Sequence, residues 1–523
     1  MTLFDSIILL LILLFIAIYV CRPKFSHTYP LPPGPRKLPI VENLFDIPRK
    51  GNVWLEYAEM SRKFGSDIIH VSALGNSIVT LNSAKLVNDL LDKRSSIYSS
   101  RPHSVMVGEL MGWEDYLSFK PYNNGWKVQR KIFTQAFPPS DIERFQPKLL
   151  SATNDLLRVL VHTNDIGKDL HLWAAAFILD VVYGIHAEDT DLHSESYVLT
   201  AMQAVDSLAR AANPGAFYVE QIPILKYVPD WFPGATFKRK AREWACLRIK
   251  MTEDTFAVTK DRVTLGIATP SLTSIALEQM DLSQNIAEQE DHIKKVSATA
   301  YGGERSYSGT DTSVAVLGSF IAIMLMNPSI QSKAQSELDK VLAPGELPSF
   351  GDEPLLPYIT AIVRETLRLQ PPTPFAIPHS LTQDDVYEGY FIPKGTIVMP
   401  NVWSICYNEE DYPRPTEFDP SRFLNAGGKL NPDVKDPASA IFGFGRRICP
   451  GKHIATASLF IAVASILTCY TIEPELDEHG KPIEPKVQWN PEPTMLNNTL
   501  PFKCRFIPRS KEVEASLGLK FDR

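Results

Sequence analysis

One ten-residue stretch, residues 442–451, constrains the fold and chemistry of this 523-residue chain more than any other. Its only cysteine, Cys449, lies among glycines and arginines, and the apolar, helix-like segment 452–467 follows it. A thiolate is the useful metal ligand, and both cationic neighbours and a helix N-terminus favour that charged form. Gly445 and Gly451 let the loop approach something flat and bulky, because glycine accepts backbone angles that side chains forbid. The stretch therefore predicts a metal-bound thiolate rather than a buried structural cysteine.

Composition narrows the class of protein. Hydrophobic residues make up 44% and charged residues 22% of the chain, as in an ordinary folded protein. The net charge of −7 argues against nucleic acid as the main partner. Six scattered cysteines without a CxxC pair argue against a zinc site or disulfide scaffold and fit a reducing compartment. The length allows one large enzyme with two lobes.

The N-terminus predicts a membrane anchor. Residues 3–21 are apolar apart from Asp5 and Ser6 and would span roughly 28 Å as a helix, close to the ~30 Å hydrocarbon core of a bilayer. Arg22 and Lys24 follow at once, which places the remainder in the cytosol. We expect an anchor over 1–21, a proline-rich hinge over 22–40 and a catalytic domain over 41–523. A cleaved signal peptide is disfavoured by Asp5 before the run and Cys-Arg-Pro after it.

Periodicity predicts the main elements of the body. We expect helices over 54–64, 313–326 and 356–369, a hairpin over 68–81, and strands over 386–400 and 472–506. An irregular stretch is expected from Tyr98 to about Pro121. Residues 313–326 are apolar nearly all round, as in a fully buried helix. The aromatic, proline-broken stretch 216–235 is of a kind that is usually core beneath a lid.

The stretch 442–451 resembles the haem-binding loop of the cytochrome P-450 monooxygenases, in which a cysteine thiolate is the axial ligand of haem iron. The resemblance implies a mainly α fold with a smaller β lobe, preceded by one transmembrane helix, and haem b as cofactor. It makes Cys449 the iron ligand and places Phe442, Arg447 and Gly451 around the haem. In membrane-tethered members the counterpart of 216–235 also contacts the bilayer.

Three polar residues are candidates for the haem propionates. Trp126 and Arg130 are four residues apart on a predicted helix and therefore share a face. The resemblance implies that they reach one propionate and that His379 contacts the second. Without the resemblance, Trp126 and Arg130 could equally well be an ordinary interface pair. His379 would then be interpreted as a polar turn residue.

An acid and a hydroxyl, Asp311 and Thr312, enter the central apolar helix. A buried threonine more often bonds the local backbone. In the family, a similar pair lies where oxygen binds: the hydroxyl steadies the dioxygen and the acid supplies protons for its cleavage. Just upstream, Glu304 to Ser308 looks like five additional residues. Five residues rotate a helix by about 140° beyond a full turn, so a bulge, a loop or a gene-model error must account for them.

Glu365 and Arg368 lie three apart on one helical face, and Arg422 follows in a proline-rich segment. Such pairs are usually solvated surface salt bridges. The resemblance instead implies a buried structural cluster of all three beneath the haem, in which mutual hydrogen bonds must offset desolvation.

The resemblance implies a membrane-anchored monooxygenase that inserts one oxygen atom of O2 into a small apolar or aromatic substrate. No flavin or nicotinamide signature is present, so electrons must come from NADPH-cytochrome P-450 reductase, with cytochrome b5 as an optional partner. We expect the endoplasmic reticulum membrane, a single pass and a cytosolic catalytic domain. Residues 109–114 and 231–240 are similar to fungal secondary-metabolism members of the tryptamine 4-hydroxylase type, which leaves indole, other aromatic and terpenoid substrates open.

Two other functions stay open. A haem-thiolate isomerase or dehydratase that uses no dioxygen would usually lack the acid and hydroxyl, so Asp311 and Thr312 argue against it. A catalytically silent haem-binding protein is permitted by the additional residues Glu304 to Ser308.

Overall fold

The computed structural model describes residues 28–49, 51–186, 194–213, 215–306, 310–491 and 496–518. The predicted anchor, residues 1–21, and the start of the predicted hinge lie outside these ranges. The described part of the hinge is tied to the protein body: the carbonyl of Pro30 accepts a hydrogen bond from the Phe391 N–H at 2.7 Å, and that of Pro33 from the His70 N–H at 2.8 Å. Residues 28–40 therefore pack against the body rather than forming a free linker.

Helices make up most of the described chain. The longer ones are α2 (Val53–Phe64), α5 (Asn124–Ala136), α6 (Gln146–Leu160), α7 (Ile166–Tyr183), α8 (Ser194–Ala212), α9 (Thr236–Thr264), α10 (Leu272–Glu278), α11 (Ile286–Ser306), α12 (Thr310–Met326), α13 (Pro328–Val341), α14 (Pro357–Leu369) and α17 (Lys452–Cys469). The short ones are α3 (Ala84–Val87), η1 (Asn88–Lys93), α4 (Ser95–Tyr98), η2 (Val105–Leu110), η3 (Pro139–Phe145), η5 (Tyr218–Glu220), η6 (Pro223–Tyr227), η7 (Phe350–Leu355), α15 (Val402–Cys406), η8 (Pro420–Phe423), α16 (Ala438–Ile441), η9 (Gly445–Arg447) and α18 (Lys511–Ser516).

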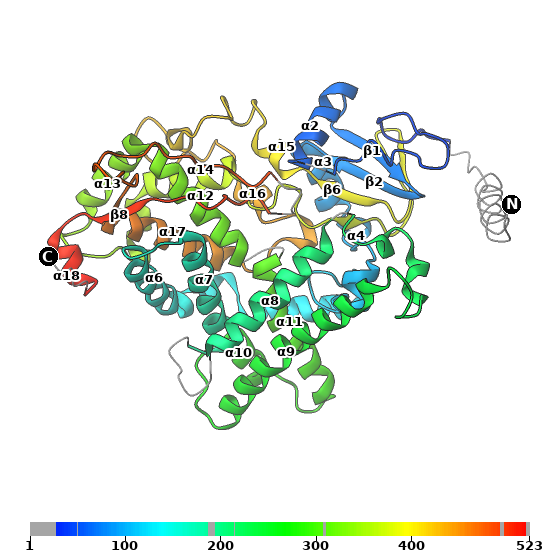
Figure 1. Cartoon of the computed structure of the whole chain (residues 1–523), viewed down its shortest axis with the longest axis horizontal. Coiled ribbons are helices and arrows are strands. Elements are labelled where there is room, and N and C mark those ends of the chain that lie inside the picture. The colour runs from blue at the N-terminus through cyan, green and yellow to red at the C-terminus, as the bar shows by residue number, and fades with distance from the viewer. Residues whose placement is uncertain are drawn as a thin grey trace.

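The strands form small sheets. They are β1 (Ile68–Ala73), β2 (Asn76–Leu81), β3 (His379–Ser380), β4 (Asp385–Tyr387), β5 (Tyr390–Ile392), β6 (Ile397–Pro400), β7 (Tyr470–Glu473) and β8 (Arg505–Pro508). The four-stranded sheet has the order β1-β2-β6-β3, with β1 and β2 forming the predicted antiparallel hairpin and β6 parallel to β2. Figure 1 shows β1, β2 and β6 together at one end of the molecule, beside a much larger helical body.

Helices α12, α14 and α17 run through the middle of that body (Figure 1). α12 and α17 are apolar around most of their circumference, and their side chains from Val314 to Leu325 and from Leu459 to Ile466 contribute to the largest hydrophobic core. In the described part of the chain, α17 is the one unbent helix long and apolar enough to cross a membrane, and 72% of it is buried. It is therefore a core helix.

The segment 216–235 contradicts the expectation of core beneath a lid. The side chains of Tyr218, Tyr227 and Trp231 are 75–80% exposed. Prolines limit the segment to the short helices η5 and η6, which leave several large apolar side chains without a covering layer. This correction gives the protein an exposed aromatic surface, which is next to α9 in the chain.

Candidate active site

A cavity lies where α5, α7, α11 and α12 meet the loop before α17. Its unfilled space, counted out to its open mouth, is about 1420 Å³. Its lining includes eight of the residues predicted from the sequence: Trp126, Arg130, Thr312, His379, Phe442, Arg447, Cys449 and Gly451. Asp311 belongs to α12, but its side chain lies outside the described part of the structure.

Cys449 is held in a tight loop at the start of α17. Its N–H donates to the carbonyl of Phe442 at 2.7 Å, and Gly451 is the N-cap of the helix. Arg130 approaches from α5, where its Nη1 donates to the carbonyl of Ile448 at 2.7 Å. Burial lowers the pKa of Arg130, and the negative charge of Cys449 partly offsets that decrease. A helix N-terminus and a guanidinium therefore both favour a thiolate at Cys449.

The glycines of this loop act differently from the expectation. Gly445 has φ +54°, and a Cβ there would lie 2.1 Å from the carbonyl oxygen of Leu91, so its close approach is to the backbone of η1. Gly451 has an ordinary φ of −86°, and a Cβ there would meet only Cys449 Sγ at 4.0 Å. Gly443, with φ +79°, lines the cavity. Gly443 and Gly451, rather than Gly445, thus border the space in front of the cysteine.

The side chain of Arg447 lines the cavity and donates hydrogen bonds to backbone carbonyls of the chain between α4 and α5. It donates to Ser99, Leu117 and Lys120 at 2.7, 3.1 and 2.7 Å. Its guanidinium carbon lies 4.5 Å from the ring centre of Trp126, which is almost fully buried. The N-cap Asn123 fixes the start of α5, since its Oδ1 accepts from the Trp126 N–H at 2.9 Å. Trp126 therefore provides a flat support for Arg447.

A third buried arginine, Arg101, lines the same cavity. It donates to the carbonyls of Ser118, Ile377 and Pro378 at 2.8, 2.9 and 2.9 Å. Burial lowers its pKa to about 9. Burial also lowers the pKa of Arg447 to about 8, and the charges of Arg101 and Arg130 add to that effect.

This cluster of Arg101, Arg130 and Arg447 lacks negative charge. Among the residues that the structure describes, no carboxylate lies within salt-bridge distance of any of the three guanidinium groups. Burying cations without a counter-charge is costly. The donor set therefore fits a ligand that carries its own carboxylates.

His379 lies beside the arginine cluster on β3. Its Nδ1 is 2.8 Å from the carbonyl oxygen of Tyr98, and the side chain is buried. Burial, followed by the charges of Arg101 and Arg447, lowers its pKa well below the usual value. The imidazole is thus neutral at pH 7 in the absence of an anion.

Two helices contribute further residues to the cavity lining. Thr299 and Ala300 come from α11, and Thr312, Ser313 and Val316 come from α12. The predicted additional residues, Glu304 to Ser308, lie outside the described part, which omits residues 307–309 and the side chains of residues 303–311.

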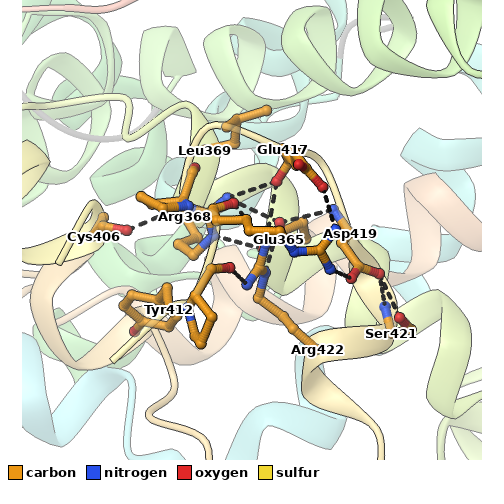
Figure 2. Close-up of polar contacts among 12 residues, drawn as sticks. Glu365, Arg368, Leu369, Cys406, Tyr412, Glu417, Asp419, Ser421 and Arg422 are labelled. Atoms are coloured by element: carbon orange, nitrogen blue, oxygen red, sulfur yellow. Dashed lines mark hydrogen bonds and ion pairs between the residues drawn. The ribbon is translucent and has the colours of Figure 1, made fainter. Parts of the chain in front are cut away.

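Glu365, Arg368 and Arg422 are brought together, as Figure 2 shows. Arg368 donates to both oxygens of Glu365 at 2.7 and 2.9 Å, and Arg422 donates to Glu365 Oε1 at 2.9 Å. Both members of the first pair have side chains that are 0% exposed. Arg368 also donates to the carbonyls of Cys406 and Pro415 at 3.1 and 2.8 Å. The cluster therefore fastens α14 to the chain around α15 and η8 and is not a surface salt bridge.

Comparison with known proteins decides the family, because the family model of cytochrome P-450 matches residues 32–498 of the chain. The chain belongs to the cytochrome P-450 family. It is 52% identical to cytochrome P-450 monooxygenase 98 of Postia placenta, over 96% of this chain and 94% of the relative. It is 38% identical to the tryptamine 4-monooxygenase of Psilocybe cyanescens, over 98% of this chain and 100% of the relative. It is 40% identical to cytochrome P-450 monooxygenase ple1 of Rhodocybe pseudopiperita, over 92% and 90%.

The chain is accordingly a cytochrome P-450 monooxygenase, an oxidoreductase whose named relatives are fungal. The family uses haem b, and NADPH supplies electrons indirectly through a reductase. The cavity fits haem b in two respects. It offers Cys449 as a sulfur ligand for iron, and its arginine cluster lacks the negative charge that two propionates carry.

Sequence reasoning missed Arg101. It precedes a proline in a stretch that was expected to be an irregular loop, and no fixed spacing links it to Arg447, 346 residues later. A basic residue beside Pro102 in an otherwise uncharged run, Tyr98 to Pro102, is the only local signal. Its burial depends on carbonyls from two separate segments.

Proposed function

We propose that the chain is a membrane-attached haem-thiolate monooxygenase that hydroxylates a small apolar or aromatic substrate in fungal secondary metabolism. One observation carries the proposal. Cys449, the arginine cluster and Thr312 all line one cavity. A thiolate, a site for two carboxylates and a hydroxyl are the groups that this chemistry requires.

In this proposal Cys449 holds the iron, and the arginine cluster, Trp126 and His379 hold the propionates. When bound, haem b supplies the activation of dioxygen, by which one oxygen atom enters a C–H bond and the other leaves as water. Thr312 positions oxygen by hydrogen bonding, and Asp311 passes protons toward it. The Glu365–Arg368–Arg422 cluster acts structurally, by fixing α14 and the chain that leads to the cysteine loop.

The substrate class is proposed from the walls of the cavity. Apart from the arginine cluster, its lining is mainly aliphatic and aromatic, with Phe133, Ile178, Val182 and Val316 as examples. Such walls favour a neutral apolar molecule, because unpaired polar groups would lose hydration there. An indole, another aromatic compound or a terpenoid fits this description, and one relative is named a tryptamine 4-monooxygenase.

Attachment to the endoplasmic reticulum membrane is proposed from two surfaces. Residues 3–21 form an apolar run long enough to cross a bilayer. The segment 216–235 adds a second contact, because Tyr218, Ile224, Tyr227 and Trp231 are each at least 70% exposed. A separate NADPH-cytochrome P-450 reductase supplies electrons from the cytosolic side, with cytochrome b5 as an optional donor.

The carbon monoxide difference spectrum of the reduced protein tests the proposal, combined with product analysis after adding reductase and NADPH. We expect a thiolate-type spectrum and a hydroxylated product. Cys449→Ser should lose the thiolate spectrum entirely, since serine supplies no thiolate. Cys246→Ser, which changes an exposed cysteine on α9, is the matched control and should leave the spectrum intact.

Two results would contradict the proposal. A thiolate spectrum that persists in Cys449→Ser would show that another group binds the iron. A normal spectrum without product from any ligand that shifts the haem spin state would favour a silent haem-binding protein.

A further inference from the structure

One carboxylate joins a segment of the cavity wall to the exposed aromatic segment 216–235. The first is the chain between α4 and α5, which contributes Arg101, Leu117 and Ser118 to the cavity wall and contains η2. The second is the exposed aromatic segment 216–235, which contains η5. Glu220, the last residue of η5, is half-buried and reaches across to the start of η2.

Glu220 accepts three hydrogen bonds there. Ser104 Oγ donates to Oε1 at 2.8 Å, the Met106 N–H to Oε1 at 2.6 Å, and the Val105 N–H to Oε2 at 3.2 Å. Two of these donors are amides of the first turn of a helix, which have no partner within the helix. Hydrogen bonds to a carboxylate are stronger than those between neutral groups. Glu220 is therefore the main polar tie between the two segments.

Further hydrogen bonds of the backbone link η2 to the wall of the cavity. In η2 the carbonyl of Val107 accepts from the Trp113 N–H at 3.1 Å, and Trp113 in turn accepts from the Tyr116 N–H at 3.0 Å. The next residue, Leu117, lines the cavity and donates to Thr299 Oγ1 on α11 at 3.2 Å. η2 and the Leu117 part of the cavity wall are thus linked by a short series of hydrogen bonds.

A second contact between the segments is weaker. Lys226 of η6 pairs with Glu109 of η2 at 2.7 Å, but both side chains are more than a fifth exposed. Such partly solvated pairs contribute little. Glu220 therefore provides most of the polar contact between the two segments.

We propose that Glu220 is a positioning residue for the substrate: by holding the first turn of η2, it fixes the Leu117 side of the cavity wall. The proposal rests on the haem-thiolate function proposed above. Glu220 touches neither haem nor substrate in this account and acts only through η2. A ligand large enough to press against the wall depends on Glu220, whereas a ligand that only reaches the iron does not.

The test compares two probes in the full-length holoprotein, 4-phenylimidazole and imidazole. Both bind haem iron through nitrogen and shift its absorption, but only the first has a ring that reaches the wall. In Glu220→Gln we expect about tenfold weaker binding of 4-phenylimidazole and faster dissociation, with imidazole affinity unchanged. Ser104→Ala, which removes one donor to Glu220 and the N-cap of η2, should give a change of the same sign. Glu243→Gln, an exposed glutamate on α9, is the matched control and should change neither affinity.

The probes also separate this proposal from the function on which it rests. If wild-type protein shows no absorption shift with imidazole, the haem-thiolate function fails and Glu220 loses its role with it. If imidazole binds normally and the ratio of the two affinities in Glu220→Gln equals that of wild type, the positioning role is wrong. Equal weakening of both probes would also overturn it, because that result indicates general loosening.

Discussion

At the scale of single residues, charge is the main property of the cavity. Arg101, Arg130 and Arg447 converge without a carboxylate among the described residues, and the neighbouring His379 is neutral. An isolated buried cation is unfavourable, so the protein without haem carries an electrostatic cost that two propionates remove. Haem binding should therefore contribute to stability as well as to function.

The pKa of His379 offers a way to measure the coupling between haem binding and charge. Its pKa is well below 6.5 without an anion, and a propionate in hydrogen-bond contact would raise it. Haem binding then takes up a proton between the two pKa values, so haem is held more strongly at low pH and less strongly as pH rises through the higher pKa. We expect haem transfer to apomyoglobin to accelerate as pH rises from the low pKa of His379 in the haem-free protein through its higher pKa in the haem-bound protein, by at most about tenfold per pH unit.

His379→Gln should flatten this pH dependence. His479→Gln, which changes a histidine with an 80% exposed side chain, is the control and should keep the wild-type slope. Equal slopes in wild type and His379→Gln would remove His379 from the propionate site.

Individual site residues were predictable to very different degrees. Cys449 could be predicted because its glycines, arginines and following helix are contiguous in the sequence. Glu365 and Arg368 could be paired because one helical turn brings them together. Arg101 and Glu220 could not be predicted, since each bonds to segments that local pattern does not connect: Glu220 to Met106 spans 114 residues.

At the scale of elements, α14 is joined to the chain around η8 by charged groups, those of the Glu365–Arg368–Arg422 cluster, where a hydrophobic contact would be usual. Glu365 and Arg368 have side chains that are 0% exposed, that of Arg422 is 7% exposed, and each of the three makes several hydrogen bonds. Such a cluster gives little net stability over an apolar core, but the loss of one member leaves an uncompensated charge.

Glu365→Gln should therefore lower the free energy of unfolding by about 3–5 kcal/mol, because Arg368 and Arg422 lose their shared counter-charge. Urea unfolding, followed by circular dichroism, measures the change. The control is Glu417→Gln, which affects the exposed pair with Arg414 and should cost at most about 1 kcal/mol. A loss in Glu365→Gln no larger than that of the control would mean that the cluster is solvated.

Long elements agree closely with the sequence pattern, whereas short ones do not. The helices expected over 54–64 and 356–369 are observed as α2 (Val53–Phe64) and α14 (Pro357–Leu369). The stretch after Tyr98 was expected to be irregular, but it contains the short helix η2. A helix of six residues without a hydrophobic period leaves no pattern from which it could be predicted. The parallel pairing of β2 with β6 joins Ile78 to Ile397, and local pattern carries no information on such a distant partner.

At the scale of the whole molecule, the exposed apolar residues are unevenly distributed. The segment 216–235 carries Tyr218, Tyr227 and Trp231, while the residues after α9 carry Leu265 and Ile267. In Figure 1 the β1–β2 lobe and the first described residues of the chain lie at one end of the molecule. An anchored N-terminus would therefore hold that end near the bilayer.

Deletion of residues 1–24 tests the second contact. We expect the truncated protein to retain partial binding to phospholipid vesicles, because the exposed aromatic side chains bury apolar area in the interface. Adding Tyr227→Ser and Trp231→Ser should lower the partition coefficient by at least about tenfold. The matched control, Leu265→Ser with Ile267→Ser, removes equally exposed apolar residues elsewhere and should have little effect. A truncated protein that is wholly unbound would exclude a second contact.

The described end of the proline segment has a consequence for how the body would be oriented on a membrane. The carbonyls of Pro30 and Pro33 are hydrogen-bonded to Phe391 on β5 and to His70 on β1, so the segment is fixed to two strands and is not free to swivel. A Cβ at Gly34 would lie 1.9 Å from the carbonyl oxygen of His70, so this contact is too close for any residue with a side chain. An inserted anchor over residues 1–21 would therefore be joined to the sheet end of the body by residues 22–27 alone, a tether too short for the body to tumble freely.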